Sequence, residues 1–140
     1  MARVAFRSLI WGLLAVGVAL AQERPNFAGT WSPVEGVNPP VDLIVTQTTT
    51  LLTAKAGDER EHALEYRLDG AESRQSAGVR SKTQWEGTRL LVTNTFATDA
   101  GTENVQKQVW SLDATDQLVI ATIRERAGQT RVTKSIYKRR

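Results

Sequence analysis

The chain has 140 residues with 18 basic and 15 acidic side chains, a formal net charge of +3, one histidine and no cysteine. Without cysteine it has no disulfides, no thiol catalysis and no Cys-ligated zinc or iron–sulfur site. One histidine is too few for a Ser/His/Asp triad or a multi-His metal site. We therefore expect a protein that is not an enzyme, holds no metal or cofactor, and is stabilised by packing alone.

The first 21 residues have the pattern of a secretory signal peptide. Arg3 and Arg7 precede an apolar run of about 12 residues, and Ala19-Leu20-Ala21 has the small-x-small pattern that signal peptidase cleaves. The apolar run is shorter than the roughly 20 residues of a membrane-spanning helix. We expect cleavage after Ala21, a mature chain from Gln22 without a membrane span, and a periplasmic or secreted location in a bacterium.

The charge of the mature chain is close to neutral. Loss of Arg3 and Arg7 leaves 16 basic and 15 acidic side chains, and three of the basic ones are the terminal Lys138, Arg139 and Arg140. A nucleic-acid-binding surface requires basic residues clustered on one face. We therefore expect no nucleic-acid partner.

Residues 22–140 have the pattern of a single all-β domain. From residue 41 onward, short β-rich runs alternate with turn signals every 8–12 residues, which is typical of a sandwich or barrel. Residues 32–40, with the sequence SPVEGVNPP, are predicted to be a loop. We predict ten strands, at residues 27–31, 41–47, 50–55, 62–68, 71–76, 81–85, 88–97, 103–112, 117–126 and 129–138.

Turn residues predict how these strands pair, because the centre of a hairpin fixes which residues face each other. Asp69-Gly70 is the strongest turn signal; it places Arg67 opposite Glu72 and Glu65 opposite Arg74. Four further centres register the last five strands: Glu86-Gly87, Ala100-Gly101, Ala114-Thr115 and Ala127-Gly128.

This register separates two faces of the sheet. We take the more apolar face as the barrel interior, since burial of apolar area drives closure. Thr93, Thr95, Gln106 and Gln108 then face outward. The predicted interior face carries Trp85, Leu90, Val92, Phe96, Val105, Val109, Leu118, Ile120 and Tyr137.

One end of the predicted interior is polar. Arg124 faces Arg131 across a hairpin, and two opposed arginines repel unless an anion lies between them. This end either opens to solvent or holds an anionic group, whose tail would follow Val92, Val109 and Ile120. The predicted ligand-binding residues are Asn94, Lys107, Thr122, Arg124, Arg131, Thr133 and Tyr137.

The predicted outer face carries an apolar row formed by Leu91, Trp110, Val119 and Ile136. Exposed apolar patches usually mark contact surfaces. Three readings remain open: the row binds a protein partner, the two faces are inverted, or residues 22–40 fold over it.

Acidic residues cluster in the sequence around the single histidine. His62 follows AGDERE and is expected to be a solvated turn residue, with haem ligation as the alternative. A polar hairpin end accounts for the acids; glycosidase chemistry or calcium binding would be the alternatives. These acids are Asp58, Glu59, Glu61 and Glu65.

Three short segments resemble the calycins, the group of lipocalins, fatty-acid-binding proteins and bacterial lipocalin-like proteins. They are Phe27-x-Gly29-x-Trp31, QWEG at 84–87 and SIYKRR at 135–140. The resemblance implies an antiparallel up-and-down β-barrel of about 8–10 strands around a cavity. Phe27, Gly29 and Trp31 would then plug the closed end, with Trp31 under Arg139 or Arg140 through a cation–π contact.

The chain also departs from this group. Ser135 stands where fatty-acid-binding proteins place an arginine, two residues before the tyrosine that matches Tyr137, so their carboxylate clamp is not inherited. Their helical lid between the first two strands has no counterpart in the short residues 32–40.

Two functions from different classes follow. The first is an exported barrel that carries or senses a small hydrophobic or amphiphilic molecule in its lumen. The second is an interaction or inhibitor module with a side-chain-filled barrel, which acts through the apolar row or its loops. A carrier needs a lined cavity of roughly 300 Å³ or more, so cavity volume discriminates between them.

Overall fold

The computed structural model describes residues 23–57, 63–76 and 78–140. The predicted signal peptide, residues 1–21, lies outside these ranges, as do His62 and its neighbours Asp58, Glu59 and Glu61.

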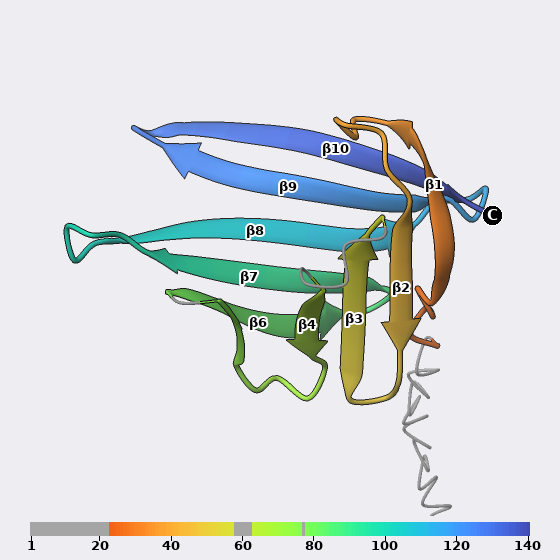
Figure 1. Ribbon diagram of the computed structural model, residues 1–140, viewed down its shortest axis with the longest axis horizontal. Coiled ribbons are helices and arrows are strands. Elements are labelled where there is room, and N and C mark those ends of the chain that lie inside the picture. Colours follow the sequence, from red (N-terminus) through yellow and green to blue (C-terminus); the bar gives the residue numbers. More distant parts are fainter. Residues whose placement is uncertain (1–22, 58–62, 77) are drawn as a thin grey trace, which may run out of the picture.

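Ten strands form one antiparallel sheet with the order β4-β3-β2-β1-β10-β9-β8-β7-β6-β5. Consecutive strands pair in an up-and-down meander except β4 and β5, which form the two edges of the sheet, and β1 pairs with β10, so the sheet nearly closes into a barrel (Figure 1). The predicted fold class is confirmed, and each predicted strand is present. The strands are β1 (Gly29–Glu35), β2 (Leu43–Gln47), β3 (Leu51–Ala56), β4 (Leu64–Arg67), β5 (Ser73–Ser76), β6 (Val79–Glu86), β7 (Arg89–Ala97), β8 (Glu103–Leu112), β9 (Leu118–Arg126) and β10 (Gln129–Arg139).

The barrel has two unlike ends. Trp31 of β1 pairs with Arg139 of β10 at one of them, which we call the closed end. The β7–β8 and β9–β10 hairpins reach beyond β1–β3 at the other, which we call the open end (Figure 1). The inner face is therefore walled more completely near Trp31 than near the hairpin tips.

Strand β1 is longer than predicted. Residues 32–35, expected to be a loop, pair with β10, and a register shift lies between Pro33 and Glu35. Proline has no N–H to donate and is tolerated at such an irregularity. After β1, Val37 packs against the buried core.

The seam between β4 and β5 differs from the predicted hairpin. The expected pairs Arg67–Glu72 and Glu65–Arg74 are wrong: Arg67 forms an ion pair with Asp69 at 2.8 Å, and Glu72 pairs with Arg80 at 3.3 Å. The Asp69 carboxylate accepts a hydrogen bond from the Ala71 N–H at 3.0 Å. This Asx-type turn, rather than a tight two-residue turn, connects the strands.

Side chains close this seam in place of a backbone ladder. The Gln75 amide accepts from the Glu65 N–H at 3.0 Å and donates to the Glu65 carbonyl at 2.6 Å. Ser73 Oγ accepts from the Arg67 N–H at 2.9 Å, and Thr83 Oγ1 donates to the Arg67 carbonyl. The outward backbone groups of Glu65 and Arg67 on edge strand β4 are thus satisfied.

Strand β8 is inverted relative to the prediction. Asn94 pairs with Gln106 rather than with Lys107, and Thr122 pairs with Gln108. The turn before β8 has three residues between the paired Thr98 and Thr102, and the turn after β8 has three between Asp113 and Gln117. In each turn the third residue has a left-handed backbone: Gly101 with φ 76° and Asp116 with φ 61°. The prediction assumed two-residue turns at both places.

A one-residue slip moves every side chain of a strand to the other face. The two slips cancel between β7 and β9, so the faces of β9 and β10 are as predicted and only β8 changes. Lys107, Val105 and Val109 therefore face outward. Trp110 faces inward and is buried, so it does not belong to the outer apolar row.

Aromatic side chains fill the closed half of the barrel. Phe27 stacks on Trp85 with ring centroids 6.0 Å apart and meets Trp110 edge-on at 5.9 Å. Tyr66 meets Trp110 from the other side at 6.3 Å. The buried core comprises Phe27, Trp31, Val45, Leu52, Ala54, Tyr66, Leu68, Leu90, Val92, Trp110, Leu118, Ile120 and Tyr137.

Candidate functional site: a polar cavity at the open end

Trp31 and Arg139 lock the closed end. The Arg139 guanidinium lies 4.4 Å from the centre of the Trp31 ring, and Trp31 Nε1 donates to the Phe27 carbonyl at 2.8 Å. Arg139 also pairs with Asp116 at 2.8 Å. Arg140 instead pairs with Asp42 at 2.7 Å, so Arg139 is the residue that covers the tryptophan.

The backbone beside this contact favours glycine. Gly29 has φ 142°, and a Cβ added there would lie 3.4 Å from Arg139 Nη1. The same Nη1 donates to the Ala28 carbonyl at 3.0 Å. The Phe-x-Gly-x-Trp spacing thus places two buried aromatic rings on either side of a glycine whose φ L side chains rarely adopt.

A cavity of ≈ 400 Å³ lies on the inner face beyond the aromatic core. Tyr66 belongs to both the buried core and the cavity wall, so its ring separates the packed half from the hollow half. Apolar and amide side chains share the wall: Ala63, Leu64, Tyr66, Gln75, Ser76, Val79, Asn94, Phe96, Gln106 and Gln108.

Hydrogen bonds fix most of the amide groups around this cavity. Ser81 Oγ donates to Asn94 Oδ1 at 2.6 Å and lies 3.2 Å from Gln75 Nε2. Trp110 Nε1 lies 3.4 Å from Gln108 Oε1. The cavity wall is therefore anchored to the core beneath it.

Arg124 sets the orientation of Gln106. In one orientation the Gln106 oxygen accepts from Arg124 Nη2 at 2.8 Å and from Nε at 2.9 Å. In the other it accepts only from Asn94 Nδ2 at 3.4 Å. Two short bonds from a guanidinium outweigh one long bond between neutral amides, so the Gln106 oxygen faces Arg124.

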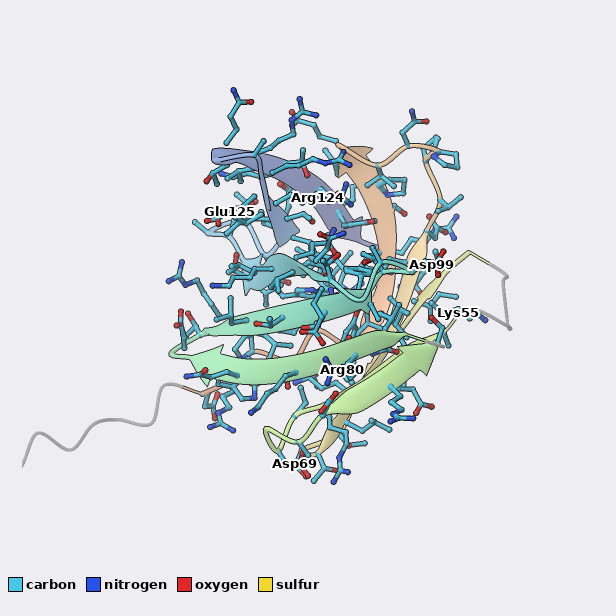
Figure 2. The ribbon with its side chains drawn as sticks, turned by 90° about the vertical axis from the view of Figure 1, so that its left-hand side faces the viewer. Lys55, Asp69, Arg80, Asp99, Arg124 and Glu125 are labelled. Carbon is cyan, nitrogen blue, oxygen red and sulfur yellow. The ribbon has the colours of Figure 1, made fainter. Side chains whose placement is uncertain are left out.

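Arg124 lies at the mouth of this cavity. With Gln106 and Phe96 it lines an adjoining hollow of ≈ 430 Å³. Figure 2 views the molecule from the open end and labels Arg124 beside Glu125 on β9. Arg131 pairs with Arg124 across the β9–β10 ladder, as the register predicts.

The predicted site residues thus fall into three groups. Asn94 lines the cavity, and Arg124 lies at its mouth with Arg131 as its cross-strand neighbour. Thr122 and Thr133 pair with each other on the same face. Lys107 faces outward between Thr93 and Ile123, and Tyr137 is buried in the core, so neither lines the cavity.

The predicted tail path is wrong. Val92 and Ile120 are packed within the core, and Val109 faces outward with β8 inverted. The sequence interpretation also missed Gln106 and Gln108, which it placed outside. Their two-residue spacing on a strand signalled a shared polar face, but the turn lengths decided which face that was.

Burial changes the acidity of both tyrosines. Desolvation raises the pKa of Tyr66 to about 12 and raises the pKa of Tyr137 above its ordinary value. Every fully buried side-chain nitrogen or oxygen in the described residues has a hydrogen-bond partner. The Tyr66 ring also lines the cavity.

We expect both tyrosines to titrate late. In the folded protein neither should be half ionised at pH 10, whereas both should titrate near 10 in denaturant. Because the native state holds these protons more tightly, their contribution to stability is complete below pH 10 and is lost as the pH rises toward 12. Tyrosinate absorbance measures this, and one tyrosine ionising normally in the folded protein would contradict it.

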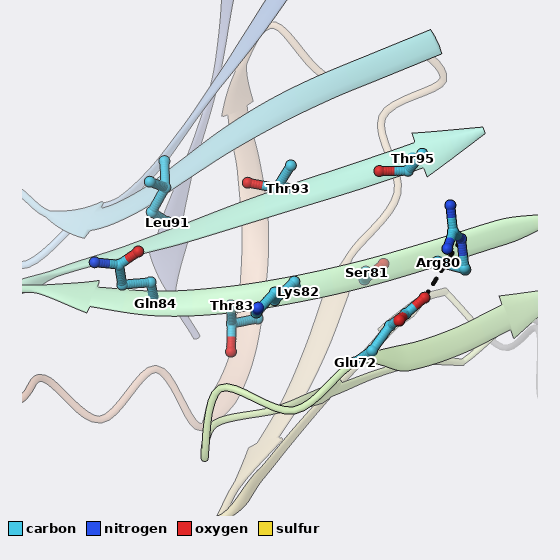
Figure 3. A pocket seen from close by; sticks show the side chains of 9 residues that line it. All are labelled: Glu72, Arg80, Ser81, Lys82, Thr83, Gln84, Leu91, Thr93 and Thr95. Atoms are coloured by element: carbon cyan, nitrogen blue, oxygen red, sulfur yellow. Dashed lines mark ion pairs between the residues drawn. The ribbon is translucent and has the colours of Figure 1, made fainter. Parts of the chain in front are cut away.

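A further hollow, of ≈ 280 Å³, lies beside β6 and β7 (Figure 3). Its Arg80 pairs with Glu72 at 3.3 Å and with Glu103 at 2.6 Å. The carboxylates thus neutralise the guanidinium. In the ranges that the structure describes, no three His, Asp or Glu side chains are grouped so as to hold a metal ion.

Fold and cavity together define a small antiparallel β-barrel, nearly closed, with a packed half and a hollow half. No protein-family model matches the chain, and no curated protein matches its sequence. Across the described segments, no helix is long and apolar enough to cross a membrane.

Proposed function

We propose that this chain is an exported, calycin-like binding protein that carries or senses a small amphiphilic molecule in the cavity at the open end. Its role is binding rather than catalysis. The observation that carries the proposal is the cavity of ≈ 400 Å³, which falls in the range of small-molecule sites, about 300–1,000 Å³.

The aromatic core limits what such a ligand can be. Phe27, Trp110 and Tyr66 occupy the barrel axis below the cavity, so a long alkyl chain has no path toward the closed end. Leu64, Val79 and Phe96 offer a short apolar wall. A compact ligand with one apolar and one polar side fits this arrangement.

Two further parts of the proposal rest on the sequence. The calycin-like assignment is supported by Phe27-x-Gly29-x-Trp31 and by the Trp31–Arg139 contact in a meander barrel. Export to the periplasm or the medium is supported by the basic start, the apolar run and Ala19-Leu20-Ala21.

Binding of the neutral amphiphilic dye Nile red tests the function. We expect saturable fluorescence enhancement with one site per chain, and loss of that site in Val79→Trp, which fills the cavity wall. Lys82→Trp adds the same side chain to the outward face of the same strand and should bind like the wild type. Absence of saturable binding, or equal loss in both variants, would refute the proposal.

One observation favours the alternative, a protein-interaction module. Leu91 pairs with Val109, and Val119 with Ile136, on the outer face of β7–β10. With Trp110 removed from this row, its largest aromatic anchor is lost. The row becomes the preferred site only if the cavity binds no small molecule.

A further inference from the structure

The seam between β4 and β5 runs along the wall of the cavity. Leu64 and Tyr66 of β4 line the cavity on one side of the seam, and Gln75 and Ser76 of β5 line it on the other. Among the described strands, every other pair of neighbours is joined by a backbone ladder, whereas side chains bridge this seam. The cavity wall therefore contains a junction that can part without the loss of a ladder.

The seam has two unlike halves. Toward the closed end, the buried side chains of Ser73 and Thr83 hold the main chain of Arg67. Beside the cavity, the Gln75 amide holds Glu65, both by its N–H and by its carbonyl. The half of the seam that borders the cavity thus depends on the position of one side chain.

A β-bulge directs Gln75 toward the seam. Arg74 pairs with Arg80 and Ser76 with Val79, so the register of β5 shifts at Gln75, which is the extra residue on its strand. Such a residue departs from the regular alternation of a strand, and bulges are frequent where a strand aims a side chain at a site. The Gln75 side chain can therefore reach across to β4 while its main chain remains part of β5.

A row of polar contacts joins Gln75 to the far wall of the cavity. Gln75 Nε2 lies 3.2 Å from Ser81 Oγ on β6, which lies 2.6 Å from the Asn94 amide on β7. The amides of Asn94 and Gln106 lie 3.4 Å apart, and Gln106 on β8 accepts from Arg124 on β9. Each strand from β5 to β9 thus contributes one side chain. Members of such a row are coupled, because the loss of one leaves its neighbours without a partner.

We infer that Gln75 is a latch that couples occupancy of the cavity to closure of the β4–β5 seam. The inference rests on the proposed function and concerns the regulation of that site. A ligand in the cavity contacts β4 and β5 at once, and these contacts exist together only while the seam is closed. The ligand therefore binds the closed form more tightly and shifts the population toward it. The open form is accessible, because short edge strands held by few hydrogen bonds belong to the least stable parts of a fold.

Amide hydrogen exchange at Glu65 measures closure of the latch, because Gln75 Oε1 accepts from this N–H. In the wild type, saturation with Nile red should slow the exchange of Glu65 by about fivefold or more. The Arg67 N–H, which Ser73 holds in the other half of the seam, should slow by less than about twofold.

Ser81→Ala interrupts the row from outside the cavity wall, since Ser81 is 1% exposed and is not a lining residue. We expect faster exchange at Glu65 and about fivefold weaker binding of Nile red, the effect of one lost hydrogen bond. Ser73→Ala makes the same substitution at another buried serine of the seam and serves as the control. It should speed exchange at Arg67 and bind Nile red like the wild type.

The possible outcomes separate the inference from the proposed function. If Nile red binds saturably but leaves exchange at Glu65 unchanged, or slows Glu65 and Arg67 equally, the inference fails and the proposed function stands. The same conclusion follows if Ser81→Ala exchanges at Glu65 like the wild type, or if both serine variants weaken binding alike. If Nile red does not bind, both are overturned.

Discussion

Trp31→Ala should lower the free energy of unfolding by about 3–5 kcal/mol, the usual cost of truncating a large buried aromatic side chain. Trp31 is 0% exposed, and its loss leaves a cavity under Arg139. The Phe27 carbonyl also loses the hydrogen bond from Trp31 Nε1. Because small domains are stable by only about 5–15 kcal/mol, this single change removes a large part of the total.

Urea unfolding of the purified variant measures this effect. Val132→Ala is a suitable control, because Val132 is 54% exposed and its truncation should change stability by no more than about 0.5 kcal/mol. A loss below about 1 kcal/mol for Trp31→Ala would show that the ring does not plug the barrel.

Gly36 directly follows β1, and Gly36→Ala should lower the free energy of unfolding more than alanine at the other glycines whose surroundings are described. Gly36 has φ +72°, and a Cβ there would lie 1.9 Å from the Lys134 carbonyl oxygen. Left-handed backbone at a non-glycine residue costs about 1–3 kcal/mol. Displacing a backbone neighbour adds a similar cost, about 1–3 kcal/mol, because packed groups yield only by shifting.

Gly101→Ala isolates the second contribution. Gly101 has φ +76°, and a Cβ there would meet nothing within 4 Å. Both variants therefore carry the backbone strain, and only Gly36→Ala carries the clash. Urea midpoints should separate them by about 1–3 kcal/mol; equal losses would mean that the chain at Gly36 does not approach β10 as closely as described.

The sequence by itself determined the architecture. Alternation of β-rich runs and turn residues located ten strands and an up-and-down order, because strand period and turn chemistry are local properties. The Ala127-Gly128 turn also predicted the β9–β10 register, including Arg124 opposite Arg131, since a two-residue turn with two left-handed residues leaves one pairing. The resemblance of the Phe-x-Gly-x-Trp segment to the calycins implied the closed end, with Trp31 under Arg139 or Arg140.

Only the tertiary structure decided the interior of the open half. The turns at residues 99–101 and 114–116 each hold three residues instead of two, and this difference inverted β8, buried Trp110 and turned Lys107 outward. Turn length depends on hydrogen bonds such as those of the Asp113 carboxylate to the Thr115 and Gln117 N–H groups, which residue types alone do not reveal. The contact between β4 and β5 could not be predicted from the sequence either. Side chains of Gln75 and Ser73 take the place of backbone partners there, and the two strands form no ladder. The orientation of the Gln106 amide followed from its contacts with Arg124 on the neighbouring strand, so this wall of the cavity exists only once β8 and β9 have paired.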